Sequence, residues 1–218
     1  MGVATGAKRG RPATASPDEV LRAVTKQYLD GERVALSLIA RQLGLSRATI
    51  YRWFGSREAL LGEAIARQLE QLAERQRREV RRRGARGLLE VFDRINRSLA
   101  RSRALRRFLE QERSAALRLL TAGSGVVQPR AVAYVETMIE AEVVSGRYEP
   151  PTDIRTLAYA IVRLAEAFLY NDTAVGIRGE HARLRQVEAA LLGVRTDYGR
   201  GSARRSERGR RPGSHSAI

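Results

Sequence analysis

Two short helical patterns separated by a tight turn occupy residues 36–54, and they constrain the fold of this chain more than any other feature. The positions spaced to face a core are apolar, namely Ile39, Leu43 and Leu45. Ala40 is small where two helices would cross closely, and Gly44 stands where the first helix should end with a left-handed backbone. We therefore expect helices near 36–43 and 46–53 that pack against each other across this turn.

The second of these helices has an inward and an outward face. Ser46 precedes it and can accept a hydrogen bond from its first turn, while Ile50 and Trp53, three residues apart, can face the core. The remaining side chains are available to solvent or DNA: Arg47, Ala48, Thr49, Tyr51 and Arg52. An ordinary helical hairpin would share the apolar stripe. The combination of turn glycine, small alanine, cap and polar second helix favours a DNA-binding helix-turn-helix.

Apolar residues at helical spacing continue through most of the chain, and no segment alternates as a half-buried strand does. Ser16, Pro17 and Glu19 form the pattern of a capping box with proline at the first helical position, and Gly31 is typical of the end of that helix. Further helices are expected at 56–82, 86–101, 104–121, 128–145, 153–175 and 180–195. The sequence therefore predicts an all-α fold with about nine helices.

The same patterns divide the chain into four segments. Residues 1–15 and 197–218 lack apolar periodicity and are rich in small and basic residues, which predicts a disordered basic arm and a disordered basic tail. We expect a three-helix helix-turn-helix domain at 16–76, with its motif at 36–54. A larger helical domain should follow at 77–196.

Composition limits the possible functions. The 218 residues have a formal net charge of +16, which would attract a polyanion such as DNA, although a G+C-rich genome also produces an arginine bias. There is no cysteine, and the two histidines are His181 and His215. The chain therefore has almost none of the residues that a histidine-dependent catalytic triad or a multi-histidine metal site needs. No apolar run approaches the roughly 20 residues that cross a bilayer. We expect a cytoplasmic protein that is not an enzyme, with no catalytic residue, cofactor, metal or membrane partner.

Residues 31–61 resemble the DNA-binding domain of TetR-type transcriptional regulators. The matching positions are Gly31, Ser37, Ile39, Ala40, Leu43, Gly44, Ser46, Thr49, Ile50, Tyr51, Phe54, Ser56, Arg57, Glu58, Leu60 and Leu61. The likeness covers about residues 16 to 75. The family commonly has lysine where this chain has Arg57, and histidine or tyrosine near Trp53. The resemblance implies that the helix at 46–53 enters the major groove of DNA.

This placement assigns expected DNA contacts. Arg47 and Arg52 can donate to guanine edges or phosphates, and Thr49 can meet a thymine methyl group or a phosphate. The resemblance implies that Tyr51 and Arg57 contact the DNA backbone. Ser46 is also included among the expected DNA-binding residues. The segment from Arg9 to Pro12 resembles the core of an AT-hook, so Arg9 and Arg11 are expected in a minor groove. The alternative for this arm is a solubilising tail.

The larger domain has two apolar seams at heptad-like spacing. They consist of Leu157, Ile161, Leu164 and Phe168 in one helix and Leu184, Val187 and Leu191 in the last. Either seam could close the core of a single chain. The resemblance implies that the domain at 77–196 binds an effector and forms a dimer, because the family usually dimerises through its last two long helices.

A second stripe at 159–170 combines polar and aromatic side chains, namely Tyr159, Arg163, Glu166 and Tyr170. It could line a ligand pocket with apolar walls from Phe92, Phe108, Tyr134 and Met138, or Arg163 and Glu166 could form an intrahelical ion pair. The C-terminal half is also similar to the QsdR-like subgroup of the family, on Ala160 to Arg163, Glu166 and the stretch 168–172. That similarity implies a small, mainly apolar effector, such as a lactone signal or a related metabolite.

The sequence thus predicts a regulator that binds double-stranded DNA as a homodimer, on a pseudo-palindromic operator, and responds to a small molecule. The competing hypothesis, which rests on charge alone, is a basic protein that binds nucleic acid without sequence preference and has no effector.

Overall fold

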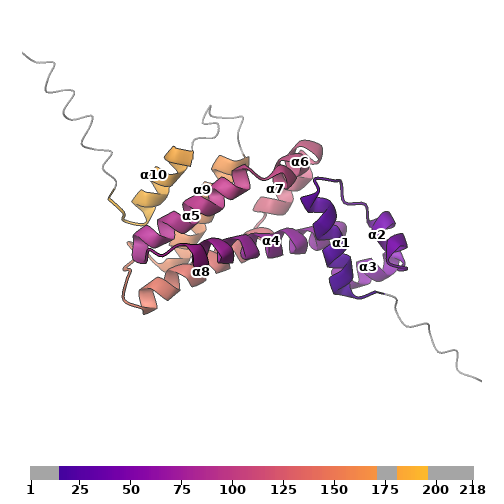
Figure 1. The fold of residues 1–218 in the computed structure, drawn as a ribbon, viewed down its shortest axis with the longest axis horizontal. Helices are drawn as coiled ribbons and strands as arrows, with labels where there is room; N and C mark the ends of the chain where they lie inside the picture. The colour runs from indigo at the N-terminus through magenta and orange to yellow at the C-terminus, as the bar shows by residue number, and fades with distance from the viewer. Residues whose placement is uncertain (1–14, 171–180, 196–218) are drawn as a thin grey trace, which may run out of the picture.

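The computed structural model describes residues 15–170 and 181–195, and its regular elements in these ranges are all α-helices (Figure 1). They are α1 (Pro17–Leu29), α2 (Leu36–Gln42), α3 (Arg47–Phe54), α4 (Arg57–Glu79), α5 (Gly84–Ala100), α6 (Arg103–Gln111), α7 (Arg113–Thr121), α8 (Val127–Val144), α9 (Ile154–Tyr170) and α10 (His181–Leu191). The all-α prediction is confirmed, with ten helices in the described ranges where about nine were expected.

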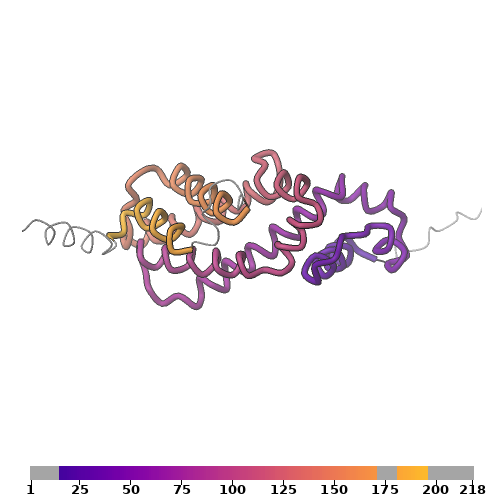
Figure 2. The backbone as a smooth tube through the Cα atoms, turned by 90° about the horizontal axis from the view of Figure 1, so that it is seen from above, coloured from indigo at the N-terminus to yellow at the C-terminus, as the bar shows by residue number. Residues whose placement is uncertain are grey.

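The long helix α4 connects two groups of helices. Figure 1 shows α1, α2 and α3 together at one end, and α5, α8, α9 and α10 around the other half of α4. Figure 2 shows the same elongated arrangement from above. Because α4 has 23 residues, it spans about 34 Å. It is therefore the one continuous element that runs from the helix-turn-helix to the far end of the larger helical group.

The helix starts follow the capping signals of the sequence. Ser16 accepts a hydrogen bond from the backbone of Glu19, whose side chain bonds back to the Ser16 backbone, so the predicted capping box is present. Ser46 and Ser56 cap α3 and α4 in the same way, each through its side-chain oxygen. These caps satisfy N–H groups that have no partner within the helix.

The end of α4 differs from the expected helix at 56–82. The helix ends at Glu79 because Val80 adopts an extended conformation and is buried, with 2% of its surface exposed. Gly84 then begins α5 with a φ of +64°, and a Cβ at this position would lie 2.5 Å from the carbonyl oxygen of Arg147. Only glycine fits this close approach, so the corner between α4 and α5 is held against the end of α8.

The helix expected at 104–121 is two helices in the structure. Glu112 interrupts it with φ −137° and ψ 44°, outside the helical region. The carboxylate of Glu112 accepts two hydrogen bonds from Arg57, a residue 55 positions earlier. The break is thus stabilised by a tertiary contact that the local sequence pattern does not contain.

The core consists of two clusters of buried side chains. The first joins α1, α2, α3 and the start of α4 to α6 and α7, and includes an edge-to-face contact between Tyr28 and Phe108 with ring centroids 6.1 Å apart. The second joins α5, α8, α9 and α10. Helices α6 and α7 therefore pack against the helix-turn-helix group as well as against the larger group.

Candidate DNA-binding surface and effector cavity

The turn between α2 and α3 is built as the sequence predicts. Gly44 has a φ of +66°, in the left-handed region where glycine has no steric penalty. Ile39 and Ile50 are buried almost completely, and Trp53 is half-buried against the same cluster. This anchoring fixes which face of α3 points outward.

The outward face of α3 presents Arg47, Ala48 and Arg52 to solvent. Arg47 donates a hydrogen bond to the hydroxyl of Tyr51 at 3.3 Å and lies 5.8 Å from the centre of its ring. Ser46 and Thr49 are joined by a hydrogen bond of 2.9 Å between their hydroxyl oxygens. Arg47 and Tyr51 are thus held together, whereas no hydrogen bond or ion pair of Arg52 occurs among the described residues.

Arg57 is held within the protein. It donates to both carboxylate oxygens of Glu112, at 2.7 and 3.0 Å, and to the carbonyl of Val34 at 3.2 Å. Its side chain is 22% exposed. Three of the five N–H groups of the guanidinium are thus used within the protein, which leaves two that could reach a phosphate. Arg9 and Arg11 of the expected AT-hook lie outside the described residues, as does the whole of the predicted basic tail.

A cavity of about 80 Å³ lies among α4, α5, α8, α9 and α10. Of the predicted ligand-binding residues, Phe92, Tyr134, Met138, Glu166 and Tyr170 line it. The structure places the other three elsewhere. Phe108 packs against Tyr28 in the first core cluster, Tyr159 is 51% exposed, and Arg163 lies on the solvent side with 47% of its side chain exposed.

Two buried carboxyl groups interrupt the apolar wall of this cavity. Glu166 accepts hydrogen bonds from Gln128 at 3.1 and 3.2 Å and from Arg163 at 2.9 Å, so the predicted intrahelical pair is present. Burial nevertheless raises the pKa of Glu166. Glu188 is fully buried and accepts one hydrogen bond, from Asn96 at 2.8 Å. Burial raises the pKa of Glu188 to about 7.

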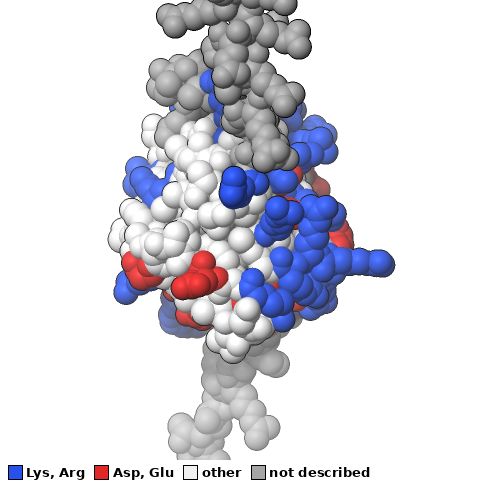
Figure 3. Space-filling view, turned by 90° about the vertical axis from the view of Figure 1, so that its left-hand side faces the viewer, with Lys and Arg blue, Asp and Glu red and all other residues white. Residues whose placement is uncertain are grey.

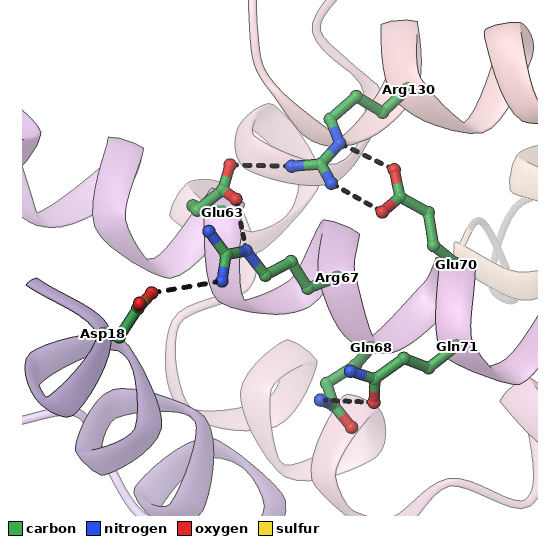
Figure 4. A network of polar contacts seen from close by, with 7 residues as sticks. All are labelled: Asp18, Glu63, Arg67, Gln68, Glu70, Gln71 and Arg130. Carbon is green, nitrogen blue, oxygen red and sulfur yellow. Dashed lines mark hydrogen bonds and ion pairs between the residues drawn. The ribbon is translucent and has the colours of Figure 1, made fainter.

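A polar network connects the cavity to α1 (Figure 4). Arg130 of α8 donates to Glu70, a cavity residue, at 2.5 and 2.7 Å and to Glu63 at 2.7 Å. Arg67 joins Glu63, at 2.7 Å, to Asp18 of α1, at 3.5 Å. The middle of α4 is therefore tied to α8 on one side and to the start of α1 on the other.

Comparison with protein-family models gives two matches. Residues 83–193 match "Tetracyclin repressor-like, C-terminal domain", and residues 32–64 match "Bacterial regulatory proteins, tetR family". The two matches fall on the larger helical group and on the helix-turn-helix. The chain belongs to the TetR family of transcriptional regulators.

Solved structures agree with the TetR assignment. The transcriptional repressor QsdR from R. erythropolis, a TetR family member, is 26% identical, with a TM-score of 0.77 over 83% of this chain and 96% of QsdR. The resemblance of the C-terminal half to QsdR-like proteins agrees with this likeness. The regulators FadR from Bacillus subtilis, solved with stearoyl-CoA, and PfmR from Thermus thermophilus are more distant. They are 16% and 18% identical, with TM-scores of 0.46 and 0.43, over 83% of this chain and 100% and 98% of theirs. Comparison with curated proteins finds no match.

TetR family members are DNA-binding regulators rather than enzymes, usually dimeric and responsive to small molecules. Among residues 15–170 and 181–195 there is no group of three potential metal ligands. In the same ranges no helix is long and apolar enough to cross a membrane.

The two predicted dimer seams are divided between the core and the surface of one TetR-type subunit. Leu157, Ile161 and Leu184 are at most 2% exposed because their side chains pack within the core of the chain itself. Leu164, Phe168 and Leu191 are half-buried, and Val187 is 43% exposed. The heptad-like spacing therefore includes buried residues of each helix, and the four half-buried or exposed residues are the ones that a second subunit could contact.

The charge of this TetR-type chain is unevenly distributed. Seven arginines occur between residues 75 and 86, at the end of α4 and the start of α5, and the structure places them at the opposite end of α4 from α3. Figure 3 views that end and shows basic side chains gathered on one side of it, beside uncharged surface. The net charge of +16 is thus a poor guide to the DNA-binding face.

Sequence reasoning missed several polar residues of these sites. Arg41 is exposed in the last turn of α2, opposite the buried Ile39 and Ala40, and its outward register could have identified it. Glu188 lies one turn from Leu184 and from Leu192, both buried. A glutamate within an apolar stripe was the feature of the sequence that could have identified Glu188 as a cavity residue. Asn96, in the apolar stripe of α5, had the same signal.

Proposed function

We propose that this TetR family member is a ligand-responsive repressor that binds a pseudo-palindromic operator as a dimer, with α3 of each subunit in a major groove. The observation that carries the proposal is the orientation of α3, whose buried Ile50 leaves Arg47 and Arg52 on the solvent side. An arginine there can donate two hydrogen bonds to a guanine. The likeness to the repressor QsdR supports the direction of regulation.

The contacts of α3 divide into two kinds. Arg52 has no partner among the described residues and is the candidate for reading a base. Tyr51 and Arg47 are held together, so we assign them to the DNA backbone, where they position the protein without selecting a sequence. Ser46 and Thr49 are joined at the start of α3 and can turn their hydroxyls to a phosphate.

Dimerisation is assigned to the outer face of α9 and α10. Its exposed or half-buried residues are Tyr159, Ala160, Leu164, Ala167, Phe168, Val187 and Ala190. Leu164 and Phe168 belong to neither core cluster, which supports a role outside the subunit. Small and apolar side chains on neighbouring helices can form a four-helix interface with the same surface of a second copy.

The cavity is assigned to the effector. Glu70 is both a cavity residue and a partner of Arg130, so a ligand that displaces Glu70 would also disturb the contacts of Glu63 and Arg67. Because these residues lie on α4, a shift of α4 would change the distance between the two α3 helices of a dimer. Ligand and operator would then weaken each other's binding by the same factor.

Selection of bound DNA from a random pool at moderate salt tests this function. The proposal predicts an enriched inverted repeat, and a preference at one position of each half-site that Arg52→Ala removes. Arg86→Ala is the matched control, since Arg86 is exposed and lies at the far end of the molecule. Enrichment of no sequence, with Arg52→Ala and Arg86→Ala equally impaired, would favour the basic protein without sequence preference.

A further inference from the structure

Among the described residues, the cavity wall contains acidic groups but no basic side chain. Its ionisable lining residues are Glu70, Glu166 and Glu188, with Tyr134 and Tyr170, and the rest of the lining is apolar apart from two amides. The arginines that pair with two of the acids lie on the solvent side, since the side chains of Arg130 and Arg163 are 33% and 47% exposed. Solvent screens those positive charges more than the carboxylates that face the cavity.

Glu188 retains an oxygen without a partner. Its Oε1 accepts the hydrogen bond from Asn96, whereas Oε2 is buried and accepts none from the described residues. The buried Nη1 of Arg185, one turn earlier on α10, also has no partner there. A fully buried carboxylate oxygen without a hydrogen bond is costly, and such groups normally have a donor nearby. The amide oxygen of Asn96, which also lines the cavity, is a second acceptor beside it. This part of the wall therefore offers acceptors to a ligand.

On the basis of the proposed effector cavity, we infer that the ligand is a compact lipophilic amine, whose protonated nitrogen donates to Glu188 and Asn96 while its carbon body contacts the apolar wall. An ammonium group supplies both the missing donors and a charge of the opposite sign. The apolar wall around it includes Phe92, Met138 and Ile161. A cavity of about 80 Å³ suits a small ring or a short branched chain. Carboxylate ligands would meet three acids and no cation in the wall.

The groups around Glu188 set the pH at which it can bind a cation. Burial raises its pKa, Asn96 lowers it, Asp93 of α5 raises it, and Arg185 of α10 lowers it. Asp93 is paired with Arg97 at 3.0 Å, and the wall formed by α8 and α9 adds Tyr134 and Glu166. Because the pKa of Glu188 is about 7, its carboxyl group is largely neutral below that pH and ionised above it. Amine affinity should therefore rise with pH through neutrality.

Calorimetric titration of the full-length protein with four probes of one ring size tests the inference: cyclohexylamine, cyclohexanol, cyclohexanone and cyclohexanecarboxylate. We expect cyclohexylamine to bind about tenfold tighter than cyclohexanol, because only the ammonium group adds a full charge opposite to that of the Glu188 carboxylate. Glu188→Gln should remove this preference, and circular dichroism of the variant reports whether it is folded. The inference would be overturned if cyclohexanone or cyclohexanecarboxylate bound more tightly than cyclohexylamine. It would also be overturned if Glu188→Gln preferred the amine over the alcohol as strongly as wild type does.

The pH dependence of wild-type binding gives a readout that needs no variant. Between about pH 6 and pH 8, cyclohexylamine affinity should increase much more steeply than cyclohexanol affinity. A flat amine profile would contradict a role for Glu188. This inference and the proposed function can fail independently. If the protein selects an inverted repeat but shows no preference for the amine, the proposed function stands and the inference is wrong. If it binds the amine through Glu188 but binds no specific DNA sequence, the inference stands and the proposed function is wrong.

Discussion

Arg57 of α4 donates two hydrogen bonds to Glu112, the residue between α6 and α7, at 2.7 and 3.0 Å. Gln111 donates to the carbonyl of Gly31, and Arg33 lies 3.6 Å from the same carboxylate. Together with Tyr28 and Phe108, these contacts attach the helix-turn-helix to α6 and α7. The DNA-binding helices are therefore held at two places, through α4 and through this contact.

Removing the carboxylate of this contact should destabilise the protein. In Glu112→Ala, the partly buried guanidinium of Arg57 loses two charged hydrogen bonds, and we expect the free energy of unfolding to fall by about 1–3 kcal/mol. Urea denaturation measures it. The control is Asp30→Ala, which removes the exposed partner of Lys26 and should leave the midpoint unchanged. Equal midpoints for wild type and Glu112→Ala would contradict a structural role for the Arg57 contact.

Substitutions on α3 should separate positioning from sequence reading. We expect Tyr51→Ala to weaken binding to every DNA sequence, whereas Arg52→Ala should cost about 1–3 kcal/mol on the selected operator and little on a random duplex. Fluorescence anisotropy with the two duplexes, at one salt concentration, measures both effects. The assignment of Arg52 fails if both duplexes lose the same affinity.

Glu188 should make stability depend on pH in a defined direction. Its folded pKa of about 7 lies above the ordinary value of 4.5, so the folded state prefers the protonated carboxyl. Stability from this group is complete below pH 4.5 and is lost as the pH rises toward 7. Relative to Glu188→Gln, wild type should therefore lose up to about 3 kcal/mol across that range. Parallel unfolding profiles for the two proteins would show that Glu188 does not titrate in this way.

Arg130 should control how rigidly α4 is attached to α8. Burial raises the pKa of Glu63, but hydrogen bonds from Arg67 and Arg130 outweigh burial and hold this pKa below its ordinary value. In Arg130→Ala, we expect faster amide hydrogen exchange in α4 around residues 63–70, because Glu63 and Glu70 lose their shared partner. Arg78→Ala, which removes an exposed pair on the same helix, is the control and should leave that exchange unchanged. If hydrogen exchange is unchanged in Arg130→Ala, this polar network does not couple the cavity to the DNA-binding helices.

A charge on the outer face of α10 should dissociate the dimer without unfolding the subunit. Val187 is 43% exposed, so Val187→Asp adds a charge that the subunit tolerates and an apolar interface does not. Sedimentation velocity should show a dimer for wild type and a monomer for this variant, both helical by circular dichroism. Val144→Asp, at an 88% exposed position on α8, is expected to remain a dimer. If Val187→Asp also remains dimeric, the interface lies elsewhere.

The helix-turn-helix was predictable because its signals are local. Ser46, Gly44 and the spacing of Ile39 and Ile50 determine caps, turn and core face over a few residues. The contact between Arg57 and Glu112 was not predictable, because its partners are 55 residues apart and neither residue stands out in the local sequence pattern. Such a contact becomes visible only when the helices are packed.

The larger helical group shows the same limit. Heptad-like spacing in α9 correctly indicated buried residues such as Leu157 and Ile161, but a buried stripe looks the same whether its partner is in one subunit or in a second. Phe108 was expected in an apolar wall of the ligand pocket, yet it packs on Tyr28. Glu188 was the stronger clue, since a charge in an apolar stripe has few structural explanations.

The spacing of the two half-sites tests the central claim most directly. The inverted repeat obtained by selection should be compared with a copy that has about five extra base pairs, half a helical turn, between its half-sites. A dimer with two fixed α3 helices predicts tight, saturable binding to the first duplex and only the affinity of a random duplex for the second. Equal affinity for both would contradict the account, because it would mean that the subunits bind DNA independently.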